Sequence, residues 1–278
     1  MKKIFRVLTM AMVGIAVIGL SSCYKKFDPK SYQPAFTFNG FSSVAEIAAA
    51  NLVGYWAFDG SYIDSVSKTA GTGVGTSFTG GFKGQALQGA DKGYVLSAPS
   101  NAIKNLQSFT ISEWIKTPPP STGIIDIFTL SNPEKFWGNI EIFFENGSDN
   151  SNGKLRVHVS QNGNDNTYSV DGIPSLFNAW VNIGVTYDAS NSTFKIFKNG
   201  SQVSSGAAGV SGPLSFTTVG NLVFGTTQFQ TTPSQTTGSG SQPWASFLTG
   251  QIDEIRVYNK ALTESELQAL VVLQGKGK

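Results

Sequence analysis

Acidic side chains within apolar, strand-like runs are the residues of this sequence with the clearest chemical potential. Asp253 and Glu254 stand side by side in QIDEIRVY, Glu141 and Glu145 bracket EIFFE, and Glu113 lies in FTISEWIK. Carboxylates in such positions bind cations, and two of them about 5 to 10 Å apart can hydrolyse a glycosidic bond. The strand face that each side chain occupies decides between these chemistries.

Strand alternation does not indicate a catalytic pair. Glu141 and Glu145 share one face, but Phe143 lies between them and Glu145 opens the loop-like segment 145–153. We interpret the two as solvated acids at a strand edge, since charged side chains are rarely buried without partners. A glycoside hydrolase with an unrecognised acid pair is kept as an alternative.

Glu113 is harder to explain, because alternation places it on the side of Phe109, Ile111 and Ile115. Three interpretations stay open. The side chain lines a sheet face that is open to solvent, or it is buried and paired with a base such as Arg256, or it is a catalytic acid with a raised pKa.

The neighbouring acids Asp253 and Glu254 need separate explanations. Alternation places Glu254 beside Arg256, which accounts for its charge, and places Asp253 on the face of Ile255 and Val257. A carboxylate at the edge of an apolar face needs backbone N–H groups or a cation. Asp253 is therefore a candidate metal ligand or a cap on backbone amides.

His158 is the only histidine and Cys23 the only cysteine. Because His158 alternates with Val157 and Val159, we expect it to point outward beside Arg156. A zinc site or a Ser-His-Asp triad needs further ligands or partners. The sequence therefore disfavours both.

Tryptophans outside the strand-like runs are candidates for sugar binding, since aromatic rings beside amide groups form the usual lining of ligand sites. Trp137 lies in a connection, and Trp244 follows the polar segment 226–243. We expect these two residues, with Tyr168 and Asn166 behind them, to contact a ligand. The alternative is that they plug the ends of the fold. The core tryptophans are expected to be Trp56, Trp114 and Trp180.

Composition and turn spacing predict an all-β protein. The chain has 31 glycines, 20 phenylalanines and only 14% charged residues, and short β-like runs alternate with turn clusters from Leu52 onward. None of the runs is expected to be parallel. The predicted strands are Val53–Phe58, Tyr94–Ser97, Phe109–Lys116, Ile124–Leu130, Ile140–Phe144, Leu155–Ser160, Trp180–Tyr187, Phe194–Lys198, Leu222–Phe224 and Ile252–Tyr258.

Two local signals are sharper than the rest. Asn199-Gly200 predicts a two-residue hairpin turn between FKIFK and SQVSS, because both residues tolerate positive φ. Thr263 and Glu266 have capping-box spacing and precede an apolar stripe, which predicts a C-terminal helix that docks on the sheets.

The first residues resemble the signal peptide of bacterial lipoproteins. Residues 1–22 contain Lys2, Lys3 and Arg6, then an uncharged run, and end in LSS directly before Cys23, which is expected to be lipidated. Residues 23–51 predict a tether with one short helix, and 52–278 a single folded domain. The resemblance implies a bacterial outer-membrane lipoprotein, on the cell surface or the periplasmic face, whose membrane contact is the lipid alone.

Charge gives no indication of a nucleic-acid partner. Without the three basic residues of the leader, the chain has 17 basic and 18 acidic side chains. There is no cluster of Lys and Arg and no glycine-rich phosphate loop.

Six motifs follow one another in an order that resembles LamG-like domains: LVGYWAFDGSYIDS, FKGQALQG, SFTISEWIKT, WVNIGVTYD, FKIFKNGSQV and GQIDEIRVYNKALTESEL. These domains belong to the concanavalin A-like lectin and glucanase superfamily. The resemblance covers Leu52 to about Leu270 and implies a jelly roll, a two-sheet antiparallel β-sandwich with a short C-terminal helix.

The resemblance also bears on ligands. It implies a structural Ca²⁺ ion at the positions of Asp59, Asp64 and Asp253. The Glu-x-Asp-x-Glu pattern of the enzymatic relatives is missing, so no catalytic residue is expected and the protein is taken as a non-enzyme. It is expected to be a carbohydrate-binding module that captures polysaccharide or host glycan. The alternative from another class is an adhesion or scaffold protein that binds a protein partner in the envelope.

Overall fold

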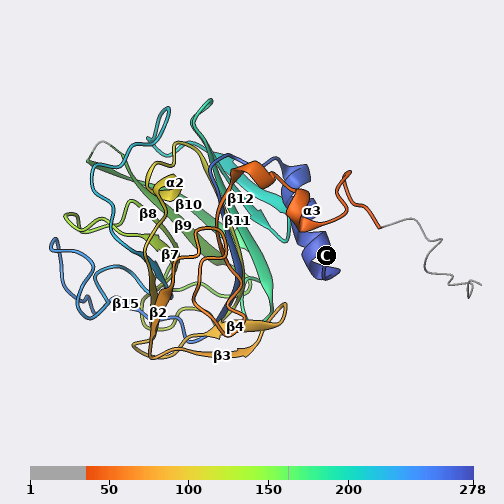
Figure 1. The fold of residues 1–278 in the computed structure, drawn as a ribbon. Helices are drawn as coiled ribbons and strands as arrows, with labels where there is room; N and C mark the ends of the chain where they lie inside the picture. The colour runs from red at the N-terminus through yellow and green to blue at the C-terminus, as the bar shows by residue number, and fades with distance from the viewer. Residues whose placement is uncertain (1–35, 162) are drawn as a thin grey trace, which may run out of the picture. The chain divides into compact units, whose positions relative to one another are not determined.

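The computed structural model describes residues 36–161 and 163–278, and residues 37–278 form one compact unit. The expected leader and Cys23 lie outside the described residues. Two eight-stranded sheets make a sandwich, as the sequence predicted (Figure 1). No helix in the described part of the chain has the length and apolar character needed to cross a membrane.

The first sheet has the strand order β13-β12-β11-β6-β16-β4-β3, with β1 paired to β16. Its pairings are antiparallel. The strands are β1 (Leu52–Trp56), β3 (Ser77–Gly80), β4 (Gln85–Gln88), β6 (Phe109–Lys116), β11 (Val181–Asp188), β12 (Thr193–Lys198), β13 (Ser201–Gly206) and β16 (Gln251–Tyr258).

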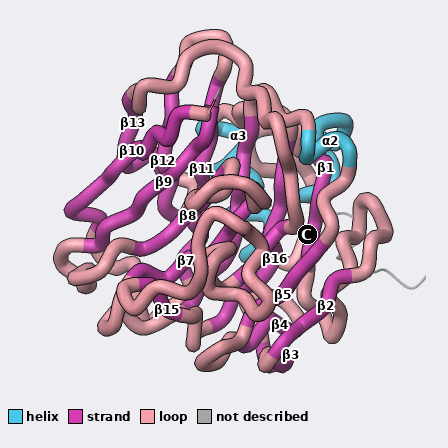
Figure 2. Tube along the Cα trace, turned by 90° about the vertical axis from the view of Figure 1, so that its left-hand side faces the viewer, coloured by secondary structure: helices cyan, strands magenta, loops and turns pink. Residues whose placement is uncertain are grey.

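The second sheet has the order β10-β9-β8-β7-β14-β5-β2, and β15 pairs with β7 in parallel. This short parallel pair corrects the expectation that no strand is parallel. Figure 2 shows the two sheets as magenta strands joined by long pink loops. The strands are β2 (Gly71–Val74), β5 (Tyr94–Ser97), β7 (Ile124–Leu130), β8 (Ile140–Phe144), β9 (Gly153–Gln161), β10 (Asn164–Ile173), β14 (Leu222–Phe224) and β15 (Ala245–Ser246).

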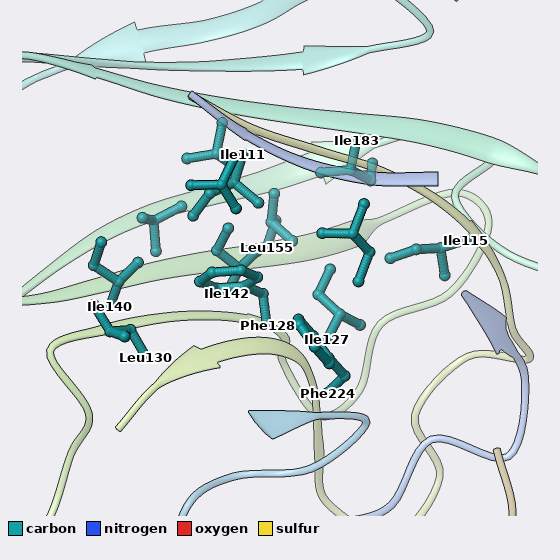
Figure 3. Packing of buried hydrophobic residues seen from close by; sticks show 14 of the residues in the cluster. Ile111, Ile115, Ile127, Phe128, Leu130, Ile140, Ile142, Leu155, Ile183 and Phe224 are labelled. Carbon is teal, nitrogen blue, oxygen red and sulfur yellow. The ribbon is translucent and has the colours of Figure 1, made fainter. Parts of the chain in front are cut away.

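The inner faces of the sheets carry alternating aliphatic and aromatic side chains that form one core. Ile111 and Ile183 of the first sheet face Ile127, Phe128 and Ile142 of the second (Figure 3). All five side chains are at most 1% exposed. The continuous packing fixes the two sheets against each other and leaves their outer faces to be covered separately.

Helix α3 (Glu264–Gly275) covers the outer face of the first sheet (Figure 1). Its N-terminus has the predicted capping box, in which the Thr263 hydroxyl accepts from the Glu266 N–H and the Glu266 carboxylate accepts from the Thr263 N–H. The predicted hairpin is also present, with φ of 51° at Asn199 and 81° at Gly200.

Residues 37–51 belong to the folded unit rather than to a free tether. They contain η2 (Val44–Glu46) and η3 (Ala49–Asn51), where one short helix was expected. Val44 and Ile47 are buried against Leu267 and Leu270 of α3. Apolar burial explains the difference, because these side chains complete the core under α3. Another helix in the described part of the chain, α2 (Asn101–Lys104), contacts β1.

Candidate functional site

The outer face of the second sheet lies under a layer made by two connections, residues 131–139 between β7 and β8 and residues 225–244 between β14 and β15. Four rings from these connections pack together: Phe136, Trp137, Phe229 and Trp244, which we call the aromatic layer. The ring centroids of Trp137 and Trp244 are 5.9 Å apart. The structure thus brings the two sequence-predicted loop tryptophans together.

The sheet beneath holds the Trp137 ring from below. Trp137 is stacked on Phe143 of β8, with 5.7 Å between ring centroids and 4° between ring planes, and lies 5.3 Å from the His158 ring of β9. Trp137 is half-buried as a result, whereas Trp244 is 41% exposed. These tryptophans cover a sheet face rather than plug the ends of the sandwich.

Buried glutamines hold the covering connections in place. Gln228 accepts a hydrogen bond from the Asn132 N–H at 2.7 Å and donates to the carbonyl groups of Lys135 and Phe136 at 2.8 and 3.0 Å. Its side chain is fully buried. The oxygen and the NH2 group of the buried Gln228 side chain are therefore both bonded to backbone groups of the other connection. These bonds hold the two connections together and so position the rings of the aromatic layer.

Gln230 has the same function nearer to Trp244. Its amide donates to the carbonyl groups of Gln242 and Ala245 at 3.1 and 2.6 Å and accepts from the Gln242 N–H at 2.7 Å. The backbone on both sides of Trp244 is therefore anchored. The segment 226–243, which composition indicated only as a loop, is a structured cover.

Tyr168 and Asn166 do not join this site. Tyr168 is buried in the core, where its ring is stacked on Phe194 and its hydroxyl contacts Ser204 at 2.6 Å. Asn166 is opposite Val159 in the ladder and so projects to the inner side of β10, away from the aromatic layer. Strand parity turns these two candidates to the other face, so the structure does not bring them next to the tryptophans, and a ligand contact at either residue stays a prediction.

The core tryptophans are distributed over three environments. Trp56 is in the main core and donates to the Ser97 hydroxyl at 3.3 Å. Trp114 is buried on the outer face of the first sheet, where it is stacked on Phe82 and donates to Gln274 of α3. Trp180 is only half-buried.

Two buried acids lie on the outer face of the second sheet. Glu141 of β8 is opposite His158 in the ladder, and Asp126 of β7 is opposite Phe143. Both carboxyl groups are 0% exposed. Burial raises the pKa of each, and the Glu141 charge further raises the pKa of Asp126.

Glu141 corrects the interpretation of a solvated edge acid. The strand is central in the sheet, and the connection that follows β7 passes over it, so solvent does not reach the carboxyl group. Glu145 fits the interpretation better, since its side chain is 34% exposed and lies 3.4 Å from the Arg156 guanidinium. Asp126 was overlooked; a single acid within the apolar run IIDIFTL was the signal that could have identified it.

Glu113 is buried in the core of the sandwich without a partner. It is 0% exposed, and neither carboxyl oxygen has a hydrogen bond within the described part of the chain. Burial raises its pKa to about 8. Arg256, the partner that the sequence suggested, instead lies on the Tyr55 ring and donates to Glu254 at 3.0 Å.

A β-bulge explains where Asp253 lies. The ladder between β16 and β6 shifts between Asp253 and Arg256, and Glu254 has a φ of 53°. The extra residue moves Asp253 onto the outer face opposite Trp114, not onto the face of Ile255 as simple alternation predicted. There its carboxylate accepts from the Lys83 N–H at 2.9 Å.

The three carboxylates expected to hold calcium do not converge. Asp64 is buried and accepts hydrogen bonds from the N–H groups of Tyr55, Val66 and Ser67, which present positive charge to its oxygens. No group of three acidic, histidine or cysteine side chains with metal-site geometry occurs among the described residues. Asp64 therefore does not fit as a calcium ligand.

Asp59 and Asp253 both contact the turn between β3 and β4. Asp59 accepts from the Gln85 N–H at 2.6 Å. Burial raises the pKa of Asp253 to about 7, and the charges of Glu254 and, to a smaller extent, of Asp59 act in the same direction. Both acids have a structural function in capping backbone amides. A calcium ion at these two residues stays a prediction.

His158 points away from the core as expected but is not exposed. The outer face of β9 is covered by Trp137, and the His158 side chain is 3% exposed. Its Nδ1 lies 3.2 Å from the Thr167 hydroxyl and its Nε2 3.4 Å from the Asp165 carboxylate. Burial lowers its pKa to about 4, so the ring is neutral near pH 7.

Comparison with known proteins gives a family for the chain. The Laminin_G_3 family model, described as concanavalin A-like lectin/glucanases superfamily, matches residues 88–268. A search of curated proteins found no match. The family resemblance that the motifs indicated is thereby confirmed.

Solved structures show the same fold at low identity. Domain 4 of AbnA, a GH43 extracellular arabinanase from Geobacillus stearothermophilus in complex with arabinotriose, is 19% identical over 80% of this chain and 98% of that chain, with a TM-score of 0.55. The binding domain of botulinum neurotoxin DC has been solved with SialylT and with rat synaptotagmin II. The respective identities are 13% and 14%, and the TM-scores 0.57 and 0.58.

The matches to the toxin structures cover 83% and 82% of this chain but only 52% of each toxin chain. This chain therefore spans about half the length of those binding domains. At these identities, the likeness establishes the fold.

Proposed function

This chain belongs to the concanavalin A-like lectin/glucanases superfamily, and we propose that it is a non-catalytic carbohydrate-binding module whose sugar site is the exposed part of the aromatic layer. The convergence of Trp137 and Trp244 carries the proposal. Sugar rings stack on aromatic faces that are accessible and rigid, and both tryptophans come from connections anchored by buried glutamines.

Polar groups for hydroxyl recognition are available on the same connections. A groove of about 400 Å³ is lined by Pro133 of the first connection and by Gln235, Thr236 and Thr237 of the second. Asn221 lies at its side and donates to Gln235 at 2.8 Å. Neither Trp137 nor Trp244 lines this groove, so its amide and hydroxyl groups would contact the more distant sugars of a longer glycan chain.

The ligands of the structural neighbours support a glycan as the partner. The arabinanase domain was solved with arabinotriose and the toxin domain with SialylT. The toxin domain was also solved with synaptotagmin II, so a protein partner is the competing hypothesis. The exposed Trp244 ring beside the half-buried Trp137 ring favours the glycan.

Burial of the acids beneath the layer supports a non-catalytic function. A glycosidase needs both carboxylates at the scissile bond. Asp126 and Glu141 are 0% exposed, and a sugar stacked on Trp244 would be separated from them by the aromatic layer and its backbone. Neither acid is in a position to attack or protonate such a ligand.

A glycan array tests the proposal. The purified protein should retain oligosaccharides, and Trp244→Ala should lose them, because removing an exposed stacking ring costs about 2 kcal/mol, or roughly 30-fold in affinity. Trp180→Ala is the matched control, because that half-buried ring contacts Phe82, in the turn between β3 and β4, and its removal should leave binding intact. Retention of no glycan by folded protein, with capture of envelope protein instead, would favour the competing hypothesis.

We also propose that lipid on Cys23 holds the module on the bacterial outer membrane, at the surface or the periplasmic face. The LSSC sequence after an uncharged run supports this. Mass spectrometry of the mature N-terminus tests it: a diacylglyceryl cysteine is expected, and an unmodified Cys23 would contradict the proposal.

A further inference from the structure

Unpartnered oxygen atoms gather between β7 and β8, under the aromatic layer. A bulge in β7 between Asp126 and Phe128 makes Asp126 and Thr129 successive side chains on the outer face. Thr129 is directly opposite Glu141, so Asp126 is diagonal to it. Cross-strand and diagonal neighbours lie within reach of each other, which brings two carboxyl groups and a hydroxyl group to one place.

All three side chains are fully buried. The carboxyl oxygens of Asp126 and Glu141 and the hydroxyl oxygen of Thr129 have no hydrogen bond of normal geometry in the described part of the chain. Thr227, in the covering connection, has a buried hydroxyl group in the same condition. The Thr129 hydroxyl group faces the Asp126 carboxyl group without a hydrogen bond of normal geometry, so the oxygen atoms of both side chains remain available to a ligand.

Nearby bases do not neutralise the two acids. His158, opposite Glu141, is neutral near pH 7 and makes its polar contacts with Thr167 and Asp165. Arg156, two residues before it, is engaged by Glu145 and Asp171. The protein itself therefore supplies no positive charge to this place among the described residues around it.

Two adjacent carboxylates in a buried site each cost several kcal/mol to ionise without compensation. A divalent cation removes that cost for both. Carboxylate and hydroxyl oxygens are the donors preferred by hard cations such as Mg²⁺, Mn²⁺ and Ca²⁺, whereas zinc and copper prefer nitrogen and sulfur.

We propose that Asp126 and Glu141, with the Thr129 hydroxyl group, bind a hard divalent cation beneath the aromatic layer. The ion would join β7 to β8 directly under residues 136–138, since the backbone of Gly138 packs against Glu141. This cation site is distinct from the proposed sugar site on the exposed part of the aromatic layer and from the turn that contacts Asp59 and Asp253. The inference does not depend on glycan binding.

Metal-dependent melting tests the site. Protein treated with EDTA should gain about 5 to 10 °C in Tm when calcium, magnesium or manganese is added at about 100 times its Kd. The variant D126N/E141Q keeps the side-chain shapes but removes both charges, so its Tm should not respond to the cation. The control variant D59N/D253N should respond like the native protein.

Terbium luminescence excited through tryptophan provides a second measurement that does not need D126N/E141Q to fold. In the D59N/D253N background, saturable emission that calcium displaces is expected. A native Tm that is the same with and without cations, together with no saturable emission, would overturn the proposal. So would a response that persists in D126N/E141Q or disappears in D59N/D253N, and the latter result would place the ion at Asp59 and Asp253.

Discussion

Replacing Glu113 by glutamine should stabilise the protein at alkaline pH and leave it nearly unchanged at acidic pH. Glu113 lies in the core with no hydrogen-bond partner, and burial raises its pKa from 4.5 to about 8. The folded state therefore keeps the proton that the unfolded state releases above pH 4.5. Stability contributed by this group is greatest below pH 4.5 and falls as the pH rises to 8.

The magnitude follows from the two pKa values. Each pKa unit corresponds to about 1.36 kcal/mol. Relative to its value below pH 4.5, the free energy of unfolding of the native protein should therefore fall by less than about 1 kcal/mol at pH 5 and by about 4 kcal/mol at pH 8. Glutamine resembles the protonated acid in shape and has no charge. Glu113→Gln should therefore exceed the native protein by about 4 kcal/mol at pH 8, a large share of the 5 to 15 kcal/mol typical of folded domains.

Urea denaturation at pH 5 and pH 8, followed by tryptophan fluorescence, measures this difference. The exposed Glu134→Gln is the control, because it changes the same charge at the surface and should shift neither curve. Equal pH dependence in the native protein and Glu113→Gln would refute the reasoning, as would a variant that is less stable at pH 8.

Two further predictions concern the cover and the helix. Gln228→Ala removes the side chain that joins Asn132 to Phe136, and the free energy of unfolding should fall by about 3 kcal/mol because buried backbone groups lose their partners. Urea titration should show this loss, and glycan affinity should fall with it. An unchanged glycan affinity would show that the sugar site does not depend on the connections that Gln228 holds. Thr263→Ala removes the capping box of α3 and should lower the free energy of unfolding by about 1 kcal/mol in the same titration, whereas Thr263→Ser should lower it much less. Equal losses in the two variants would argue against a capping function of the hydroxyl group.

Sequence alternation predicted the elements where the pattern of apolar residues was strong. The bounds of β6, β7, β8 and β14 are those expected, and so is the Asn199-Gly200 hairpin. The strands β2, β3, β4, β10 and β15 were missed. Glycines or polar residues dilute the strand signal in the first four, and β15 has only two residues.

The face of a side chain could not be predicted where the ladder is irregular. The bulge at Glu254 turns the Asp253 side chain to the opposite face of the sheet. The positive φ of Glu254 depends on the pairing of β16 with β6, a strand more than 130 residues earlier in the sequence. Nothing in the local sequence IDEIRV marks that extra residue.

Burial of the acids depends on contacts that are distant in the sequence. Glu141 becomes inaccessible because residues 131–139 and 225–244 cover the sheet, and those connections are held by Gln228 and Gln230. Composition indicated only a polar loop there. The tryptophans themselves were identifiable, since Trp137 and Trp244 lie outside every strand-like run.

Calorimetric titration of native protein and Trp244→Ala with an oligosaccharide retained on the array tests the glycan-binding account most directly. The ring is 41% exposed, so the variant should keep the native Tm within about 2 °C while its Kd rises roughly 30-fold. An unchanged Kd in a folded Trp244→Ala protein would contradict the account.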